Sequence, residues 1–546
     1  MKTVALTAVV LVVLLGGGAP RSQEISTDIF PSEDEIYDAL RSGEITYQQY
    51  LILREIAIDG IDSTSHHLLD EIPNLNFFNV DSLALKTSLE NEQETPFEDR
   101  RGPTPTRRMV TGQFRQRYRR YAEDEDRSKS STSVQMNINN TITADIEIRR
   151  EYTGDDRFVS RSIQYRSSRG PVREVVLGNF SRRFGLGTVF GYRGKLFGLA
   201  RDLSGESFLY PDYGGLNGGL ARLSFRGYEV QTLGSVVRSE FTRLFSWGAM
   251  VQATSFPFKP SVVLGITRLK NRRTGEYVAD NKLALNGRHD YGCGYSAVEV
   301  CWQGGERSTF GAVVAEGRHR FRQAEIRYAG WSYSDGYIDL SGGSKAAAIY
   351  HDQTFETVDR EYTSKRFGQQ GLLAKTVVDL SDKIELANSL LYASFNADTA
   401  NTQWLAQVSR KFDCVSVGID FLSRGQTRSD FSSARRQTRL ITRWRLGNFY
   451  LRTYIGYNSH RVKRDFTSFF VDLKYNFDSY GKMELWSNVS EIDHNVGRIK
   501  RWYAFVRSSI EVMGGVSVAL KLSHTYSAGS EQEHRTIVGF DLSCCW

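Results

Sequence analysis

The sequence predicts an all-β fold, a large transmembrane antiparallel β-barrel, preceded by a small α-helical domain. Three observations predict this fold class. The first 22 residues have the order of a secretory signal, no later apolar run approaches the roughly 18 residues of a membrane-spanning helix, and apolar residues recur at alternate positions from Met109 onward. Strands that close on themselves can cross a bilayer without such helices, because closure leaves no backbone group unpaired.

Residues 1–22 are interpreted as a signal peptide. Lys2 precedes an apolar run from Val4 to Leu15, and small residues follow at 16–19. This order of charged, apolar and small residues is typical of secretory signals, and a run of twelve residues is too short to span a bilayer. We expect cleavage between Gly18 and Ser22, and export of the remaining chain.

Residues 23–92 have a helical period and are predicted to form a small periplasmic domain. Ser32 can cap a helix over residues 33–40, whose acidic first turn suits the positive end of a helix dipole. A second helix is expected over 46–59 and a third over 65–72, where Pro73 ends it. A domain this small is expected to pack against another structure, and residues 23–92 are the candidate binding surface for a periplasmic protein partner.

Segment 61–75 resembles the first half of a helix-hairpin-helix unit of the kind found in competence-type DNA-binding proteins. In that family two hairpin glycines let backbone amides meet a phosphate, whereas Ile72-Pro73-Asn74-Leu75 contains no glycine here. The resemblance therefore implies a helical packing unit, and nucleic acid is not an expected partner. A formal charge of +7 over 546 residues is also too small an excess to predict nucleic-acid binding.

Residues 93–108 are predicted to be a charged linker that contains three prolines, and residues 109–546 are predicted to be the barrel. Turns are expected between alternating segments at Asn139-Asn140, Ser381-Asp382, Gly447-Asn448, 479–481 and Gly514-Gly515. At roughly 18 to 20 residues for a strand and its turn, this length predicts about 20–26 strands, more than one soluble sandwich holds. No repeated propeller blade is evident in the sequence.

The last strand alternates strictly, with its apolar series at Val538, Phe540, Leu542, Cys544 and Trp546. Small or polar residues lie between them, so one face suits lipid and the other suits a polar interior. An amphipathic edge strand of a soluble sandwich is the alternative. The strand resembles the closing strand of Gram-negative outer-membrane barrels, in which the aromatic C-terminal residue is the assembly signal. This resemblance implies an outer-membrane location, with outer-membrane lipid and the barrel-assembly machinery as partners.

The residues between the apolar positions are expected to face the lumen, and they include charges of both signs. This mixture favours ion pairs between neighbouring strands over the one-sided ring of an anion-selective pore. One group is uniformly basic, namely Arg439, Arg443, Arg445 and Arg452. These four arginines are the candidate for a positive constriction or for a track that binds an anionic substrate.

A segment rich in glycine and aromatic residues occurs early in the barrel, at Gly178, Phe180, Phe184, Gly185 and Gly187. It resembles a signature of large uncharacterised outer-membrane proteins that carry helix-hairpin-helix-like N-termini. Dense glycines let a backbone bend sharply or approach another segment closely. We therefore expect either a barrel corner or an inward-folded loop, continued by the glycines up to Gly219, which is a candidate for constriction or partial plugging.

The sequence contains no pattern that predicts catalysis or cofactor binding. It has no nucleophile elbow, zinc-protease helix, phosphate-binding loop or dinucleotide fingerprint, so neither an enzyme nor a cofactor is expected. The five cysteines lack zinc-site spacing and are interpreted as small apolar fillers, with one disulfide as the alternative.

Two functions remain open at this stage. In the first, the barrel is a channel or transporter that passes solutes or a substrate across the outer membrane, and the N-terminal domain gates it or docks a partner. In the second, the barrel is an anchor with a filled lumen and serves as an interaction platform in an envelope assembly. Transport is preferred, because a barrel of more than about 16 strands leaves an aqueous lumen unless it is plugged.

Overall fold

The structure, a computed structural model, describes the chain from residue 110 to residue 546 apart from its gaps. The gaps are 123–127, 140, 151–155, 168–169, 181, 192–207, 210, 212–215, 239–241, 273–274, 276, 305–308, 335–336, 338–339, 341–368, 382, 396–398, 428–431, 461–464, 478–480, 494–498, 514 and 529–531. The expected signal peptide, helix-hairpin-helix-like domain and linker therefore lie outside the described residues. Within the described ranges no helix is long and apolar enough to cross a membrane.

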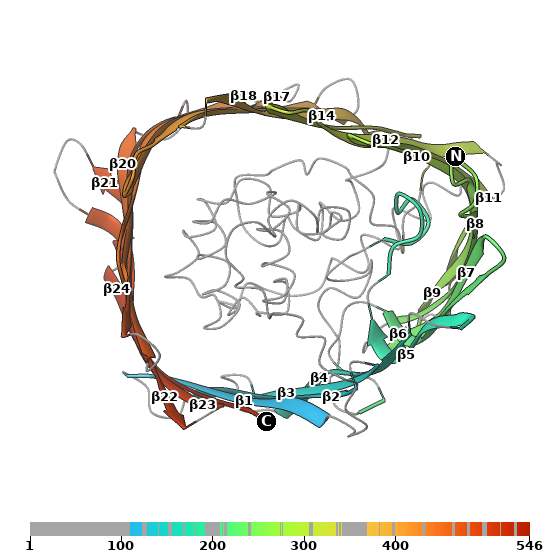
Figure 1. Cartoon of the computed structure of the whole chain (residues 1–546), viewed down its shortest axis with the longest axis horizontal. Coiled ribbons are helices and arrows are strands. Elements are labelled where there is room, and N and C mark those ends of the chain that lie inside the picture. The colour runs from blue at the N-terminus through green and yellow to red at the C-terminus, as the bar shows by residue number, and fades with distance from the viewer. Residues whose placement is uncertain are drawn as a thin grey trace.

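The described residues form 24 antiparallel strands that close into one barrel, within the expected range (Figure 1). The first twelve are β1 (Val110–Tyr121), β2 (Ser128–Ile138), β3 (Ile142–Arg150), β4 (Asp156–Arg166), β5 (Val172–Phe180), β6 (Leu216–Phe225), β7 (Tyr228–Arg238), β8 (Thr242–Ala253), β9 (Ser261–Asn271), β10 (Tyr277–Tyr291), β11 (Gly294–Gly304) and β12 (Thr309–Arg320). The second twelve are β13 (Ala324–Tyr333), β14 (Gln369–Ser381), β15 (Ile384–Phe395), β16 (Thr399–Lys411), β17 (Val415–Thr427), β18 (Ser432–Leu446), β19 (Phe449–His460), β20 (Phe466–Phe477), β21 (Gly481–Asp493), β22 (Ile499–Met513), β23 (Val516–Ala528) and β24 (Gln532–Cys545).

Each strand pairs with the next in the chain, and β24 pairs with β1 to close the sheet. At this seam the backbone N–H of Gly112 donates to the carbonyl of Trp546 at 2.9 Å, and the N–H of Trp546 donates back at 3.0 Å. The start of β1 and the end of β24 thus lie at the same rim, which we call the turn rim. The two longest connections, β5 to β6 and β13 to β14, leave from the opposite rim.

Two of the expected hairpins show why these residues turn. Asn139 and Gly447 have φ angles of +53° and +56°, a left-handed conformation that asparagine and glycine accept most readily. Their strands pair in the register that such turns impose, Ile138 with Ile142 and Leu446 with Phe449.

The alternation of β24 places its apolar series on the outside of the barrel. Val538, Phe540 and Trp546 are 48%, 40% and 55% exposed, whereas Ile537 and Asp541 on the inner face are each 8% exposed. Exposed apolar side chains recur on the outer face of most other strands. A closed barrel with this outer surface is suited to a hydrocarbon environment.

Along β7 to β13 the inner face departs from the expected polar lumen, because buried apolar side chains lie there beside buried polar ones such as Gln231 and Glu299. Leu233, Leu244, Val263 and Val314 are at most 1% exposed and belong to the hydrophobic core of the molecule. The apolar positions of this inner face pack against chain that folds into the lumen. Unbroken apolar runs such as Val262-Val263-Leu264 were the available sequence signal for this packing.

Candidate functional site in the barrel lumen

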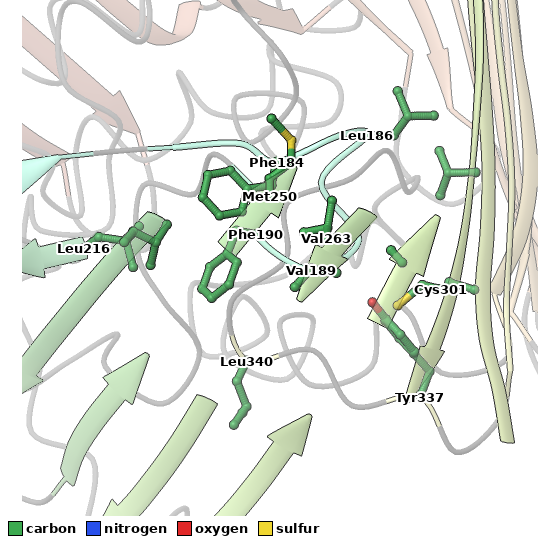
Figure 2. Close-up of a cluster of buried hydrophobic side chains, with 14 of the residues drawn as sticks. Phe184, Leu186, Val189, Phe190, Leu216, Met250, Val263, Cys301, Tyr337 and Leu340 are labelled. Carbon is green, nitrogen blue, oxygen red and sulfur yellow. The ribbon is translucent and has the colours of Figure 1, made fainter. Parts of the chain in front are cut away.

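The described residues that follow β5 fold into the lumen. This stretch, residues 182–191, is called the lumen segment, and it projects inward from the wall in Figure 1. Figure 2 shows Phe184, Val189 and Phe190 of the segment grouped with Met250 and Val263 of the wall. Phe184 and Phe190 are 0% exposed, and their ring centroids lie 5.6 Å apart in an edge-on arrangement. Of the two expectations for this region, the structure shows an inward-folded loop at residues 182–191. Gly178 and Phe180 belong instead to β5, and Gly218 and Gly219, expected in the loop, belong to β6.

Glycines of the segment rich in glycine and aromatic residues allow this fold. Gly178, Gly185 and Gly187 have φ angles of +107°, +57° and +86°, which side chains disfavour. A Cβ at Gly185 would lie 1.9 Å from Oε2 of Glu299, and one at Gly178 would lie 2.3 Å from the carbonyl oxygen of Arg161. A side chain at either position would therefore separate the chain from its neighbour.

Two further glycines on the wall receive the lumen segment. A Cβ at Gly248 of β8 would lie 2.3 Å from the ring of Phe190, and one at Gly265 of β9 would lie 2.2 Å from Val189. The two glycines form a shallow notch into which these side chains pack. The sequence reasoning did not identify this notch, because a glycine within a strand is also compatible with a bulge.

A buried carboxylate holds the tip of the lumen segment to the wall. Glu299 of β11 accepts hydrogen bonds from the backbone N–H of Leu186 at 2.6 Å and of Thr188 at 2.9 Å, and from the Thr188 hydroxyl. The hydroxyl of Tyr337, in the β13–β14 connection, donates to the carbonyl of Thr188 at 2.6 Å. A buried charge is tolerated when donors surround it in this way. We call Glu299, Thr188 and Tyr337 the latch.

A second carboxylate holds the β13–β14 connection nearby. Asp280 of β10 forms an ion pair with Lys282 at 3.0 Å and accepts a hydrogen bond from the backbone N–H of Leu340 at 3.2 Å. The ammonium of Lys282 also lies 4.5 Å from the centre of the Tyr337 ring. Parts of both long connections are therefore fixed against the same region of the inner wall. The sequence signal for Glu299 was a single acid among apolar neighbours in Val298-Glu299-Val300.

The four candidate arginines lie on two adjacent strands and face inward. Arg443 of β18 and Arg452 of β19 are directly opposite each other, whereas Arg445 lies nearer the turn rim. The Cζ atom of Arg439 lies 5.6 Å from the centre of the Tyr454 ring. Acidic neighbours accompany the arginines, since Asp472 is the partner of Arg452 on the other side. The four therefore form a line along the wall that borders acidic groups.

Paired charges continue from this line to the seam, as expected from the mixed charges in the sequence. Lys474 lies 3.9 Å from Asp472 and 3.7 Å from Glu484. At the seam, Asp541 of β24 binds Arg119 of β1 at 2.6 Å and Arg507 of β22 at 3.0 Å. This part of the inner wall is an ion-pair network that links successive strands.

The C-terminal residues meet at the seam. The indole ring of Trp546 lies over Gly112, where a Cβ would come within 2.2 Å of it. Phe540 and Cys544 lie opposite Tyr118 and Phe114 of β1, so the expected assembly-signal strand is also the strand that closes the barrel. Its role as a signal stays a prediction.

The cysteines correct one expectation. All five are free, which excludes the alternative of a disulfide in this structure. Cys301 is a buried filler in the core behind the latch, as expected. Cys293, Cys414 and Cys545 are instead exposed, because they lie in turns or at the end of the last strand.

Comparison with known proteins finds no matching family model and no matching curated protein. Among solved structures, the siderophore receptor PirA from Pseudomonas aeruginosa is 8% identical with a TM-score of 0.43, over 81% of this chain and 81% of that one. The translocation pore of the P pilus usher PapC is 10% identical with a TM-score of 0.36, over 80% and 99% of the two chains. An Escherichia coli P pilus tip assembly intermediate is 11% identical with a TM-score of 0.49, over 81% and 62%. With TM-scores below 0.5, these likenesses assign no activity to this chain.

Proposed function

We propose that this protein is an outer-membrane channel or transporter whose lumen is narrowed at rest by the lumen segment. The observation that carries the proposal is the latch, in which Glu299 of the wall binds the tip of a chain segment that has folded into a wide barrel. A barrel of 24 strands is wide enough for an aqueous passage.

The arrangement of charges supports a polar cargo. The line from Arg439 to Arg452 is the proposed contact for an anionic part of the cargo, and the acidic neighbours Asp472 and Glu484 would bind its cationic parts. Charges of both signs along the wall offer a polar molecule successive weak contacts, so that it can pass from one to the next. A uniform ring of one sign would instead retain an ion of the opposite sign. The outward apolar series and the closing strand support a location in the outer membrane, with lipid and the barrel-assembly machinery as partners.

A second candidate function is an anchor with a filled lumen that serves as an interaction platform. One observation favours it. The inward charges Asp472, Glu484 and Lys521 are only 1%, 3% and 4% exposed, whereas a water-filled passage would leave such groups wetter. The two candidate functions differ in one respect. In a channel the chain that fills the lumen can be displaced, whereas in an anchor it stays in place.

Single-channel conductance in planar bilayers tests the choice. The mature chain is compared with Glu299→Gln, which keeps the shape of the side chain but removes the charge that binds Leu186 and Thr188. Because the lumen segment is then held less firmly, we expect larger or more frequent openings. Glu325→Gln is the matched control, since Glu325 pairs with Arg318 at 2.8 Å on β12 and β13, outside the latch. Silence from all three inserted proteins contradicts transport and favours the platform.

A further inference from the structure

Five aromatic side chains gather on the inner wall across β19 to β22. We call Tyr454, Phe470, Trp486, Tyr503 and Phe505 the lumen aromatic face. Neighbouring ring centroids lie between 5.1 and 5.6 Å apart, from Tyr454 through Phe470 and Trp486 to the two rings of β22. These residues alternate with outward neighbours that are exposed, including Ile455 at 53% and Val506 at 42%.

The lumen aromatic face is covered by protein. Its five residues are 0–4% exposed, although their side chains project from the wall of a wide barrel. Among the described residues, the chain that folds into the lumen packs elsewhere, since the lumen segment, Tyr337 and Leu340 belong to the core on β7 to β13. In Figure 1 the lumen segment and strands β20 and β21 lie on opposite sides of the barrel. The described stretches that enter the lumen therefore do not cover this face.

The inward charges near these rings are predominantly positive, which favours an acidic cover. The cations are Arg439, Arg452, Lys474, Arg507 and Lys521, and the acids among them are Asp472 and Glu484. Arg439 lies over the Tyr454 ring, and the ammonium of Lys521 lies 4.8 Å from the centre of the Phe505 ring. Arg452 projects from the same strand face as Tyr454. A cation that is stacked on an aromatic ring still attracts a carboxylate, and this attraction is stronger where water is excluded.

The chain offers three long stretches outside the described residues, and only one of them is acidic. Residues 23–92 contain fifteen acidic and three basic side chains, a net charge of −12. Residues 192–207 have a net charge of +1, and residues 341–368 have a net charge of zero. Residues 109–546 as a whole contain 61 basic and 45 acidic side chains. The charges of the chain are thus divided between an acidic N-terminal part and a basic barrel.

The N-terminal part can also reach the face. Residues 93–108 span roughly 50 Å when extended, and they enter β1 at the turn rim. β22 and β19 are three and six strands from β1 around the barrel, which is at most about 30 Å at roughly 4.8 Å per strand spacing. We propose that residues 23–92 enter the lumen and dock on the lumen aromatic face, with the acidic residues 33–38 beside Arg439, Arg452 and Lys521. The N-terminal domain is thus a second lumen element, opposite the latch.

Photo-crosslinking in the full mature chain tests this docking. Benzoylphenylalanine replaces Trp486 in one protein and Phe470 in another, and crosslinked peptides are identified by mass spectrometry after refolding and irradiation. We expect crosslinks to residues 23–92 from both positions. The same probe in place of Met250 is the control, with expected crosslinks to the lumen segment. Crosslinks that map only to residues 192–207 or 341–368, or to a second protein molecule, overturn the proposal.

Charge-reversal variants of the N-terminal part test whether its docking depends on electrostatic attraction. Glu33→Lys, Asp34→Lys and Glu35→Lys together are expected to lower the crosslink yield from the Trp486 position several-fold. Glu94→Lys, Glu98→Lys and Asp99→Lys make the same change of charge in the linker and are expected to leave it unchanged. Equal yields from the two triple variants contradict the electrostatic docking. The readout does not depend on conductance, so a silent protein that crosslinks as expected refutes transport alone.

Discussion

One carboxylate joins side chains across the seam between the first and last strands, and the substitution Asp541→Asn tests its contribution. Asp541 receives the guanidinium groups of Arg119 at 2.6 Å and of Arg507 at 3.0 Å. The side chain of Arg119 is 2% exposed and that of Asp541 is 11% exposed, whereas that of Arg507 is 23% exposed. Gly539 leaves room for Arg119, because a Cβ there would lie 2.8 Å from its Nη1 atom.

The expected cost follows from the burial of Arg119. Removing one partner of a buried ion pair costs about 3–5 kcal/mol, because the other charge is left uncompensated. The asparagine oxygen still accepts one hydrogen bond, which offsets about 1 kcal/mol, and Arg507 is exposed enough to regain water. We therefore expect Asp541→Asn to lower the free energy of unfolding of the barrel by about 2–4 kcal/mol.

Urea unfolding of the refolded barrel in lipid vesicles measures this cost. Asp290→Asn is the control, because Asp290 binds Lys259 and Arg288 at the turn rim, where all three side chains are more than a third exposed and each such pair contributes little. The double variant Arg119→Gln, Asp541→Asn is expected to lose less than the sum of the single variants, since the buried charge of Arg119 is no longer left without its partner and Arg507 can regain water. A free-energy change for Asp541→Asn within about 0.5 kcal/mol of the control refutes the reasoning.

The remaining predictions concern the lumen, the closing strand and the N-terminal part. Gly265→Leu places side-chain atoms where Val189 packs, so the lumen segment should leave its notch and become accessible to protease, and an unchanged digestion pattern argues against the notch. Deletion of Trp546 should lower the amount of folded barrel in the membrane, and normal levels contradict its role in assembly. Deletion of residues 23–108 should leave the heat-modifiable gel migration of the folded barrel intact while conductance increases. Loss of the folded form would show that the barrel depends on its N-terminal part.

The amino-acid sequence determined the features that repeat locally. The strict period of two in Val538, Phe540 and Leu542 predicts both a strand and which face meets lipid, because successive side chains of a strand point to opposite sides. The turn at Gly447-Asn448 follows in the same way from a residue that accepts a positive φ angle. A range of about 20–26 strands followed from length divided by the span of a strand and its turn, so the barrel itself was predictable and its exact strand number was not.

The tertiary structure alone decided which residues from distant parts of the chain meet. Glu299 binds Thr188 across 111 residues, and Arg119 binds Asp541 across 422. Neither pair produces a periodic pattern in the sequence, because the contacts depend on how the sheet closes and where a loop returns to the wall. The hydrophobic core under the lumen segment and the lumen aromatic face on the opposite wall have the same origin. A strand pattern records that a side chain points inward, and only the closed barrel determines what it meets there.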